Sequence, residues 1–356
     1  MRAACFALLL IAAFGSCAEA ITLNLTGRYR NLCSISNTSQ NEGYQLDLNR
    51  LRLQVNSELT ESISAQVQYD VEAYLGSFLK TADFNAFKNY RPPTKYDLIS
   101  PLIDSDNLYV RQKLYRFYFT FSSPAGDLKI GRQKIPWGVA RVYSATDPFN
   151  PIDFVNIERD ERTGVDAISL DAPLGSLAGL NLVYAGGRTS QDIGGRLRAN
   201  LQGTDYSILG ARLGEDYMLG LDFAGQIRGG GLRGEASYTR AKMEADYSRL
   251  VLSYDYSFSS GIYFLTEYFY NGQGKNNSTR NYGFLGLSYD RISRFKEGAY
   301  LILNLDDGST YLNPFLDYSL NESIIVTFGI NIFNGKTGAE YARYHDLYYV
   351  QAECCF

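Results

Sequence analysis

The sequence predicts an all-β protein, a transmembrane antiparallel β-barrel of 16 to 18 strands. Three observations carry this prediction. Apolar and polar residues alternate strictly in more than a dozen segments, and Tyr and Phe are abundant, with 29 Tyr and 20 Phe. No apolar run after the N-terminal segment approaches the ~18 to 20 residues that a membrane-spanning helix needs. A period of two with one apolar face suits a wall that meets lipid outside and water inside.

The first twenty residues form a separate segment. Arg2 precedes an apolar stretch at residues 6–14, and Ala18-Glu19-Ala20 follows it. Charge, apolar length and small residues in this order are typical of a secretory signal peptide. We therefore expect a signal peptide at residues 1–20 and a single barrel domain at residues 21–356. Cys17 would suit a lipoprotein site, but Phe14 stands where such a site needs a leucine-like residue.

Alternation then recurs along the whole chain. In residues 63–73 the odd positions are apolar or Tyr, and the even positions are Ser, Gln, Asp or Glu. Such a polar second face has to be solvated, and a lipid-facing wall with a wet bore meets this need. Similar segments occur at residues 23–30, 50–55, 115–121, 219–223, 250–256, 285–289, 301–305, 326–332 and 348–356. In residues 115–121 the expected outward positions are Tyr115, Phe117, Phe119 and Phe121.

The C-terminal segment closes the pattern. Tyr348, Val350, Ala352, Cys354 and Phe356 share one face, with more polar residues between them. A terminal aromatic residue resembles the signal that marks Gram-negative outer-membrane proteins for insertion by the barrel-assembly machinery. We therefore expect Phe356 to be an insertion signal, and outer-membrane lipid to surround the barrel.

The strand count is ambiguous at one place. Seventeen segments can be traced, but a bacterial barrel with both termini at one end needs an even number. The stretch 188–202 either hides a weak strand, which gives eighteen, or a neighbouring segment is not a strand, which gives sixteen. Both widths leave room for an aqueous channel.

Turns and loops set the expected orientation. Short clusters such as 122–126, 258–261 and 319–323 predict periplasmic turns, whereas 76–106 and 133–163 predict long external loops. The second follows the fifth strand, so it is the third external loop. In trimeric general porins the third loop folds into the pore. The oligomeric state stays open, and a homotrimer is one possibility. If this loop narrows the pore, its opposed charges would filter solutes. The alternative is that it is an ordinary solvated surface loop. The expected constriction residues are Arg132, Lys134, Arg141, Asp147, Asp153, Glu158 and Arg159.

The segment Gly131-Arg132-Gln133-Lys134-Ile135-Pro136-Trp137-Gly138, followed by Asp147-Pro148-Phe149-Asn150-Pro151, resembles a motif of the bacterial porin group that contains phosphate-selective porins and alginate-export-like barrels. The resemblance implies a passive channel for small hydrophilic solutes. It covers about a tenth of the chain and does not indicate the solute. Trp137 would stiffen the inserted loop, or else belong to an outer aromatic girdle, and Arg132 would anchor the loop by an ion pair.

The predicted inner face carries charges of both signs, and some of them should pair across neighbouring strands. No continuous ladder of cations can be traced, so the charge selectivity stays open. The residues expected to line the pore are Arg28, Arg30, Arg50, Arg52, Arg116, Lys129, Arg233 and Glu235.

Other classes of function find little support. The formal net charge of −4 argues against nucleic acid, and without CxxC or CxxCH no cofactor or metal is expected. We expect Cys33 to lie about ten residues, or ~30 Å, from Cys354 along the wall, beyond disulfide reach. The only histidine, His345, lacks a serine signature, which disfavours a barrel hydrolase. A structural barrel, either an adhesin or a sheath around a partner such as an electron carrier, is the main alternative to a channel.

Overall fold

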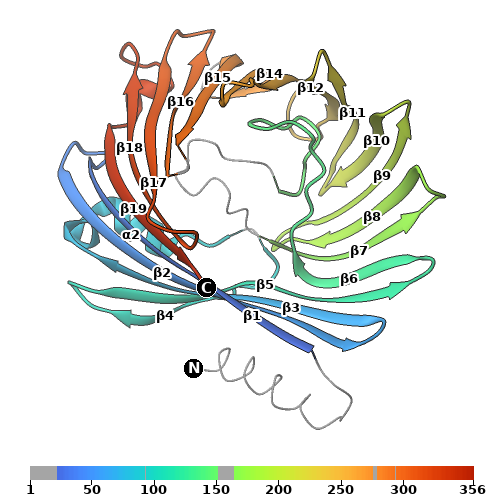
Figure 1. Ribbon diagram of the computed structural model, residues 1–356, viewed down its shortest axis with the longest axis horizontal. Coiled ribbons are helices and arrows are strands. Elements are labelled where there is room, and N and C mark those ends of the chain that lie inside the picture. The colour runs from blue at the N-terminus through green and yellow to red at the C-terminus, as the bar shows by residue number, and fades with distance from the viewer. Residues whose placement is uncertain (1–21, 93, 151–163, 276–278, 293) are drawn as a thin grey trace.

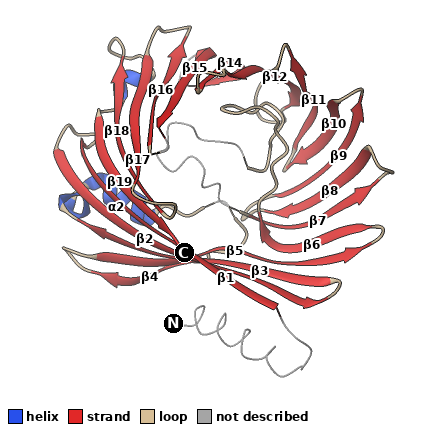
Figure 2. Ribbon diagram, in the orientation of Figure 1, coloured by secondary structure: helices blue, strands red, loops and turns tan. Residues whose placement is uncertain are grey.

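The computed structural model describes residues 22–92, 94–150, 164–275, 279–292 and 294–356. The expected signal peptide lies outside these residues. The described chain forms a ring of strands with a few short helical segments (Figure 2). None of the helices in the described part of the chain is long and apolar enough to span a membrane.

Strands β1 to β9 comprise Thr22–Asn37, Gly43–Thr60, Ile63–Leu75, Ile99–Asp104, Tyr109–Ser123, Gly126–Gln133, Val165–Pro173, Ala178–Gly186 and Gln191–Leu201. Strands β10 to β19 comprise Thr204–Leu213, Asp216–Ile227, Gly230–Arg240, Tyr247–Ser257, Ile262–Lys275, Thr279–Ile292, Phe295–Asn304, Thr310–Ser319, Ile324–Asn334 and Leu347–Cys355. The helical segments are η1 (Ser77–Lys80), α2 (Ala82–Asn89) and η2 (Tyr341–Arg343).

The sheet closes on itself (Figure 1). Apart from β4, each strand pairs antiparallel with the next one in the chain, and β19 pairs with β1. At this seam Gly27 and Phe356 exchange two backbone hydrogen bonds, of 2.7 and 2.9 Å. The short β4 pairs only with the outer part of β5 and stands outside the cycle. The nineteen strands of the described residues, less β4, therefore make a closed barrel of eighteen.

The eighteenth strand is β9, in the stretch that left the count ambiguous. Its sequence places Gly194 and Gly195 side by side and has Arg196 and Arg198 at alternate positions. Two glycines and no run of β-branched residues give a weak strand signal. Pairing with both β8 and β10 nevertheless completes its backbone hydrogen bonds.

The predicted alternation of faces is confirmed over most of the wall. On β11, Leu221 is exposed outward, whereas its neighbour Asp222 is buried on the inner face. A correction concerns β5, where the register with β3 shifts between Gln68 and Tyr69, so Tyr115 is an extra residue. This β-bulge turns the Tyr115 ring inward beneath the Arg52 guanidinium, at 4.1 Å, and not outward as alternation predicted.

The expected short turns join β5 to β6, β13 to β14 and β17 to β18, at the end of the barrel that holds the C-terminus. The long segment between β3 and β5 is more than a loop, since it contains η1, α2 and β4. The Thr81 hydroxyl caps α2 by accepting the Phe84 amide proton at 3.1 Å. Phe84 then packs in one cluster with Tyr74 and Tyr109 of the inner face, so α2 covers the wall at the mouth.

The three described cysteines are free, but their spacing differs from the prediction. Cys33 lies opposite Val350, and Cys354 lies opposite Tyr29. The separation along β1 is therefore four residues, or ~13 Å, and not ten. The estimate was wrong because it placed Cys354 beside the first residues of β1, whereas β19 ends opposite Arg28 and the start of β1 extends beyond it. Even ~13 Å exceeds the reach of a disulfide.

Candidate functional site

The interior of the barrel holds the third loop at the open end, defined here as loop 3 (residues 134–164). It follows β6, the fifth strand of the closed cycle, as the sequence predicted. Its described part, residues 134–150, lies inside the ring of strands near β11 and β12 (Figure 1). The expected constriction residues Asp153, Glu158 and Arg159 lie outside the described residues.

Two buried glutamates of the wall bind the backbone of loop 3. Glu235 on β12 is 3% exposed and Glu267 on β14 is 2% exposed. The Glu235 carboxylate accepts six hydrogen bonds of 2.6 to 2.9 Å, from the amides of Val139, Ala140, Ala145 and Thr146 and the hydroxyls of Ser144 and Thr146. Glu267 accepts three, from the amides of Arg141, Val142 and Tyr143. Charge-assisted bonds of this kind are stronger than neutral ones. Glu235, expected to line the pore, is instead covered by the loop that it anchors.

Loop 3 also packs through apolar side chains. Trp137 is 2% exposed, and its ring meets Phe149 edge to face at 5.0 Å. Its indole N–H donates to Asn181 Oδ1 on β8 at 2.9 Å. A Cβ at Gly194 would lie 2.6 Å from the indole, so this glycine of β9 makes room for it. Trp137 therefore stiffens the inserted loop and does not belong to an outer girdle.

The inner wall beneath loop 3 is apolar, which the expectation of a uniformly wet bore did not include. Inward side chains of β7, β8, β10 and β11 contact Ile135, Trp137 and Phe149 in one cluster. Those of β13 to β17 form a second cluster with Val142 and Ala145 of loop 3 and with Tyr341 of η2. These inward positions are apolar because chain, and not water, covers them.

Asp147 and Asn150 shape the loop. Asp147 Oδ1 accepts the amide protons of Phe149 and Asn150, at 3.2 and 2.8 Å. Asn150 Oδ1 in turn accepts the Ile135 amide proton at 2.7 Å, which joins the two limbs of the loop. Both side chains are buried. Asp147, expected at the constriction, thus caps a turn.

The remaining predicted constriction residues fall into two groups. Arg132 is buried, and its guanidinium donates to both Asp166 oxygens at 2.8 Å and to the Tyr96 carbonyl at 2.6 Å. It therefore anchors by an ion pair as expected, but it holds β7 and the segment after α2. Lys134 and Arg141 are exposed, and Arg141 Nε lies 4.0 Å from Asp255 of the wall.

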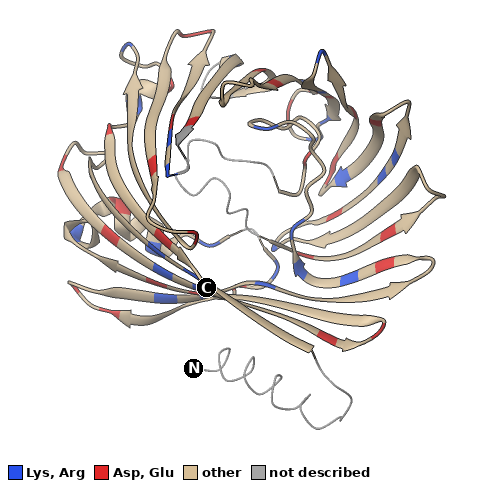
Figure 3. Ribbon diagram, viewed as in Figure 1, with Lys and Arg blue, Asp and Glu red and all other residues tan. Residues whose placement is uncertain are grey.

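The wall of β1, β2, β3 and β5 carries paired charges. Arg50 and Arg111 bind Glu72 at 2.7 and 2.5 Å, and Arg52 binds Asp70 at 2.6 Å. All five side chains lie on the inner face, as the register of β2, β3 and β5 requires. Figure 3 shows such charges of both signs along the strands.

Other predicted pore-lining cations pair as well. Arg28 and Arg30 face Glu353 across the β1–β19 seam, at 3.7 and 2.6 Å. Arg233 of β12 pairs with Asp255 of β13. The sequence predicted that part of the wall charge would be neutralised in this way.

Three inner cations of β5 and β6 form no ion pair with any described residue: Lys113, Arg116 and Lys129. Aromatic faces lie near them instead, with Tyr115 4.6 Å from Lys113 and 5.3 Å from Arg116. Arg116 Nε is buried and has no hydrogen-bond partner. The bore thus contains a group of cations without a direct ion pair among the described residues, named here the β5–β6 cations. They lie across the bore from the glutamates that anchor loop 3.

Sequence reasoning identified Arg116 and Lys129 but missed Arg111 and Lys113. Alternation continued back from Phe117, Phe119 and Phe121 would turn these two odd positions outward. The bulge at Tyr115 reverses the parity before it. The signal was present, since cations at 111, 113 and 116 can share the inner face only if one extra residue intervenes.

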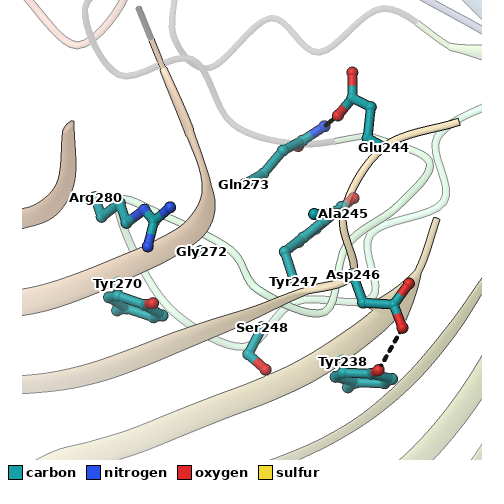
Figure 4. Close-up of a pocket in the computed structure, with 10 residues that line it drawn as sticks. All are labelled: Tyr238, Glu244, Ala245, Asp246, Tyr247, Ser248, Tyr270, Gly272, Gln273 and Arg280. Carbon is teal, nitrogen blue, oxygen red and sulfur yellow. Dashed lines mark hydrogen bonds between the residues drawn. The ribbon is translucent and has the colours of Figure 1, made fainter. Parts of the chain in front are cut away.

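Two further features belong to loops at the same end of the barrel as loop 3. His345 lies in the segment after η2, and no hydrogen bond joins it to a serine among the described residues. A hollow of about 360 Å³ lies at the rim where β12, β13, β14 and β15 meet their loops. It is lined by Tyr238, Tyr270 and Arg280, among others, and the Tyr238 hydroxyl donates to Asp246 at 2.7 Å (Figure 4).

No protein-family model matches the chain, and no curated protein matches it. Solved structures do resemble it. OccAB4 of Acinetobacter baumannii superposes with a TM-score of 0.60 at 9% identity, covering 94% of this chain and 98% of that one. OccK2 (OpdF) of Pseudomonas aeruginosa, solved in complex with glucuronate, gives 0.61 at 9% identity over 94% and 96% of the chains.

The outer membrane protein opdK of Pseudomonas aeruginosa gives a TM-score of 0.62 at 9% identity, over 94% of this chain and 98% of that one. Together with the closed cycle of strands and the loop bound inside it, these likenesses define the architecture. The chain has the fold of the Gram-negative outer-membrane porins, an 18-strand antiparallel barrel.

Proposed function

We propose that the protein is a porin of the outer membrane of a Gram-negative bacterium, through which small hydrophilic solutes diffuse passively, with a preference for anions such as carboxylates. The observation that carries the proposal is that loop 3 and the β5–β6 cations lie on opposite sides of the bore. Loop 3 is bound to one side by Glu235 and Glu267, and the β5–β6 cations stand on the other. Solutes would pass between them.

The three β5–β6 cations supply the proposed selectivity. In a narrow aqueous pore, uncompensated charge attracts counter-ions and repels ions of like charge. The Arg116 side chain is half-buried on the inner face, so its positive charge can attract a passing carboxylate. Polar amides surround it, since Gln54 and Gln68 lie on the same inner face and are bonded to each other at 2.6 Å. Glucuronate, which OccK2 was solved with, is a solute of this class.

The rest of the proposal concerns targeting. Residues 1–20 would be removed as a signal peptide, and residues 21–356 would form the mature barrel. Phe356 would serve as the insertion signal for the barrel-assembly machinery, and outer-membrane lipid would surround the wall. No catalytic role, cofactor or nucleic-acid partner is assigned.

The test is single-channel recording in a planar bilayer. The proposal predicts stable open steps of uniform size, which a filled structural barrel would not show. It also predicts that glucuronate interrupts the current at lower concentration than glucose, which has a similar size and no charge. A bilayer without steps, or a channel that glucose blocks at least as well, would contradict the proposal.

A further inference from the structure

The outward face of β1 and β2 carries a polar patch formed by Asn31, Cys33, Asp47 and Asn49, named here the β1–β2 patch. In the strand register Asn31 lies opposite Asn49, and Cys33 lies opposite Asp47. Tyr29, on the same face of β1, is 40% exposed. Strand alternation therefore turns the patch away from the bore.

The patch lies at a depth where lipid is expected. Gly27 pairs with Phe356 at the seam, and Asn31 lies four residues beyond Gly27 along β1. With a rise of ~3.3 Å per residue and a tilt of ~40°, Asn31 stands about 10 Å above the end of β19. The apolar band of such barrels is ~25 Å tall, so Asn31 lies well inside it. Hydrocarbon cannot satisfy polar groups at this depth, and a carboxylate is costly there.

Hydrogen bonds within the patch leave one donor and one acceptor unused. Asn31 Nδ2 donates to Asp47 Oδ1 at 2.6 Å and to Asn49 Oδ1 at 3.1 Å. Asn49 Nδ2 donates to the same Asp47 oxygen at 2.9 Å. An amide nitrogen has two protons, so Asn49 keeps one. Asp47 Oδ2 accepts no N–H proton among the described residues, and the other donor close to the Asp47 carboxylate is the weak Cys33 thiol.

We propose that a second copy of this chain covers the β1–β2 patch through a two-fold contact. A two-fold rotation would set the remaining Asn49 proton of each copy against the Asp47 Oδ2 atom of the other. The contact would therefore contain two identical hydrogen bonds. Such reciprocity is the property of an isologous interface. Small side chains flank the patch, with Ala352 opposite Asn31 and Ala73 opposite Asn49, and small residues let two walls approach within the membrane.

The test is cross-linking through the native Cys33, which lies in the patch and is exposed. Outer membranes from cells that make the Cys354→Ser/Cys355→Ser chain are treated with a short bismaleimide. The proposal predicts a species of twice the chain mass, and none when Cys33→Ser is added. It further predicts that Asp47→Leu/Asn49→Leu lowers the cross-linked fraction about tenfold, while the heat-dependent gel mobility of a folded barrel is kept.

The matched control moves the cysteine to the opposite wall, as Leu221→Cys in the cysteine-free chain. Leu221 on β11 is 57% exposed outward, and it should not cross-link. The proposal would be overturned if Leu221→Cys cross-linked as well as Cys33, or if a folded Asp47→Leu/Asn49→Leu variant cross-linked fully. It would also be overturned if the product had three chain masses or contained a foreign protein, or if the reagent labelled Cys33 without forming any product. The inference rests on the proposed location in the outer membrane. If the chain is absent from the outer-membrane fraction, that location is wrong, whereas a chain that is present but not cross-linked contradicts the two-fold contact alone.

Discussion

Glu235 on β12 accepts a hydrogen bond from the Ser144 hydroxyl at 2.9 Å, although 91 residues separate the two along the chain. It is one of six bonds that this single carboxylate accepts from loop 3. A buried carboxylate with so many donors fixes the course of the loop. The loop position therefore depends on the barrel wall as much as on the loop's own sequence.

Replacing Glu235 by Gln should loosen loop 3 while leaving the barrel intact. The amide keeps one acceptor oxygen but turns a donor toward the amides of Ala145 and Thr146 or of Val139 and Ala140, a loss of ~2 to 4 kcal/mol from the bound loop. We expect noisier open-channel current and faster proteolysis within loop 3. Glu215→Gln is the control, because Glu215 is exposed and, within the described part of the chain, bonds only Lys242 at the rim. Current noise equal to that of the control would refute the anchoring role.

Gly138→Ala should act on the same contact from the side of the loop. A Cβ there would lie 2.3 Å from Ser144 Oγ and 3.0 Å from Glu235 Oε1, so the loop has to shift. Because both changes disturb one contact, the double variant should be little worse than either single one. Gly43→Ala, whose Cβ meets only Asn37 at 3.5 Å, is the control. Fully additive effects on proteolysis would show that the two residues act separately.

The inward ring of Tyr115 should support the cations around it. Arg52 lies 4.1 Å and Lys113 4.6 Å from the ring centre, distances typical of cation–π contacts. Tyr115→Leu should lower the free energy of unfolding by ~1 to 3 kcal/mol, measured by urea titration in lipid vesicles. Tyr115→Phe, which keeps the ring, should lose much less. Equal losses in the two variants would mean that the ring does not hold these cations.

Phe356 is predicted to matter for assembly more than for the finished barrel. Its backbone bonds to Gly27 do not depend on the side chain, and the residue as a whole is 67% exposed. Phe356→Ala should lower the amount of heat-modifiable barrel in the outer membrane several-fold, whereas Phe356→Tyr should keep it. The measurement is the folded fraction on unheated gels. An unchanged yield in Phe356→Ala would remove this residue from the insertion signal.

The sequence predicted the fold well because the alternation within each strand indicates which residues face outward and which face inward. Alternation placed Leu221 outside and Asp222 inside without any knowledge of their neighbours. It failed at Tyr115, where one extra residue reverses the parity for the outer part of β5. A bulge is a property of the pairing between two strands, and one strand alone shows it only through misplaced charges.

The site was less predictable than the wall. Loop 3 was correctly located, and Arg132 was rightly expected to form an ion pair. However, Glu235 was assigned to the pore lining, because its strand position says only that it faces inward. Whether an inward carboxylate meets water or loop backbone depends on where the loop lies, which local pattern does not reveal. For the same reason the apolar inner wall of β13 to β17 was not anticipated.

The central claim is that the β5–β6 cations make the pore favour anions. The direct measurement is the reversal potential in a KCl gradient, for the natural chain and for Lys113→Ala/Arg116→Ala/Lys129→Ala. Arg212→Ala is the control, since Arg212 shares the outward face with Ile208. We predict a chloride-to-potassium permeability ratio above one that falls about tenfold in the triple variant and is unchanged in the control. A natural channel that prefers potassium, or a triple variant with the natural reversal potential, would contradict the account.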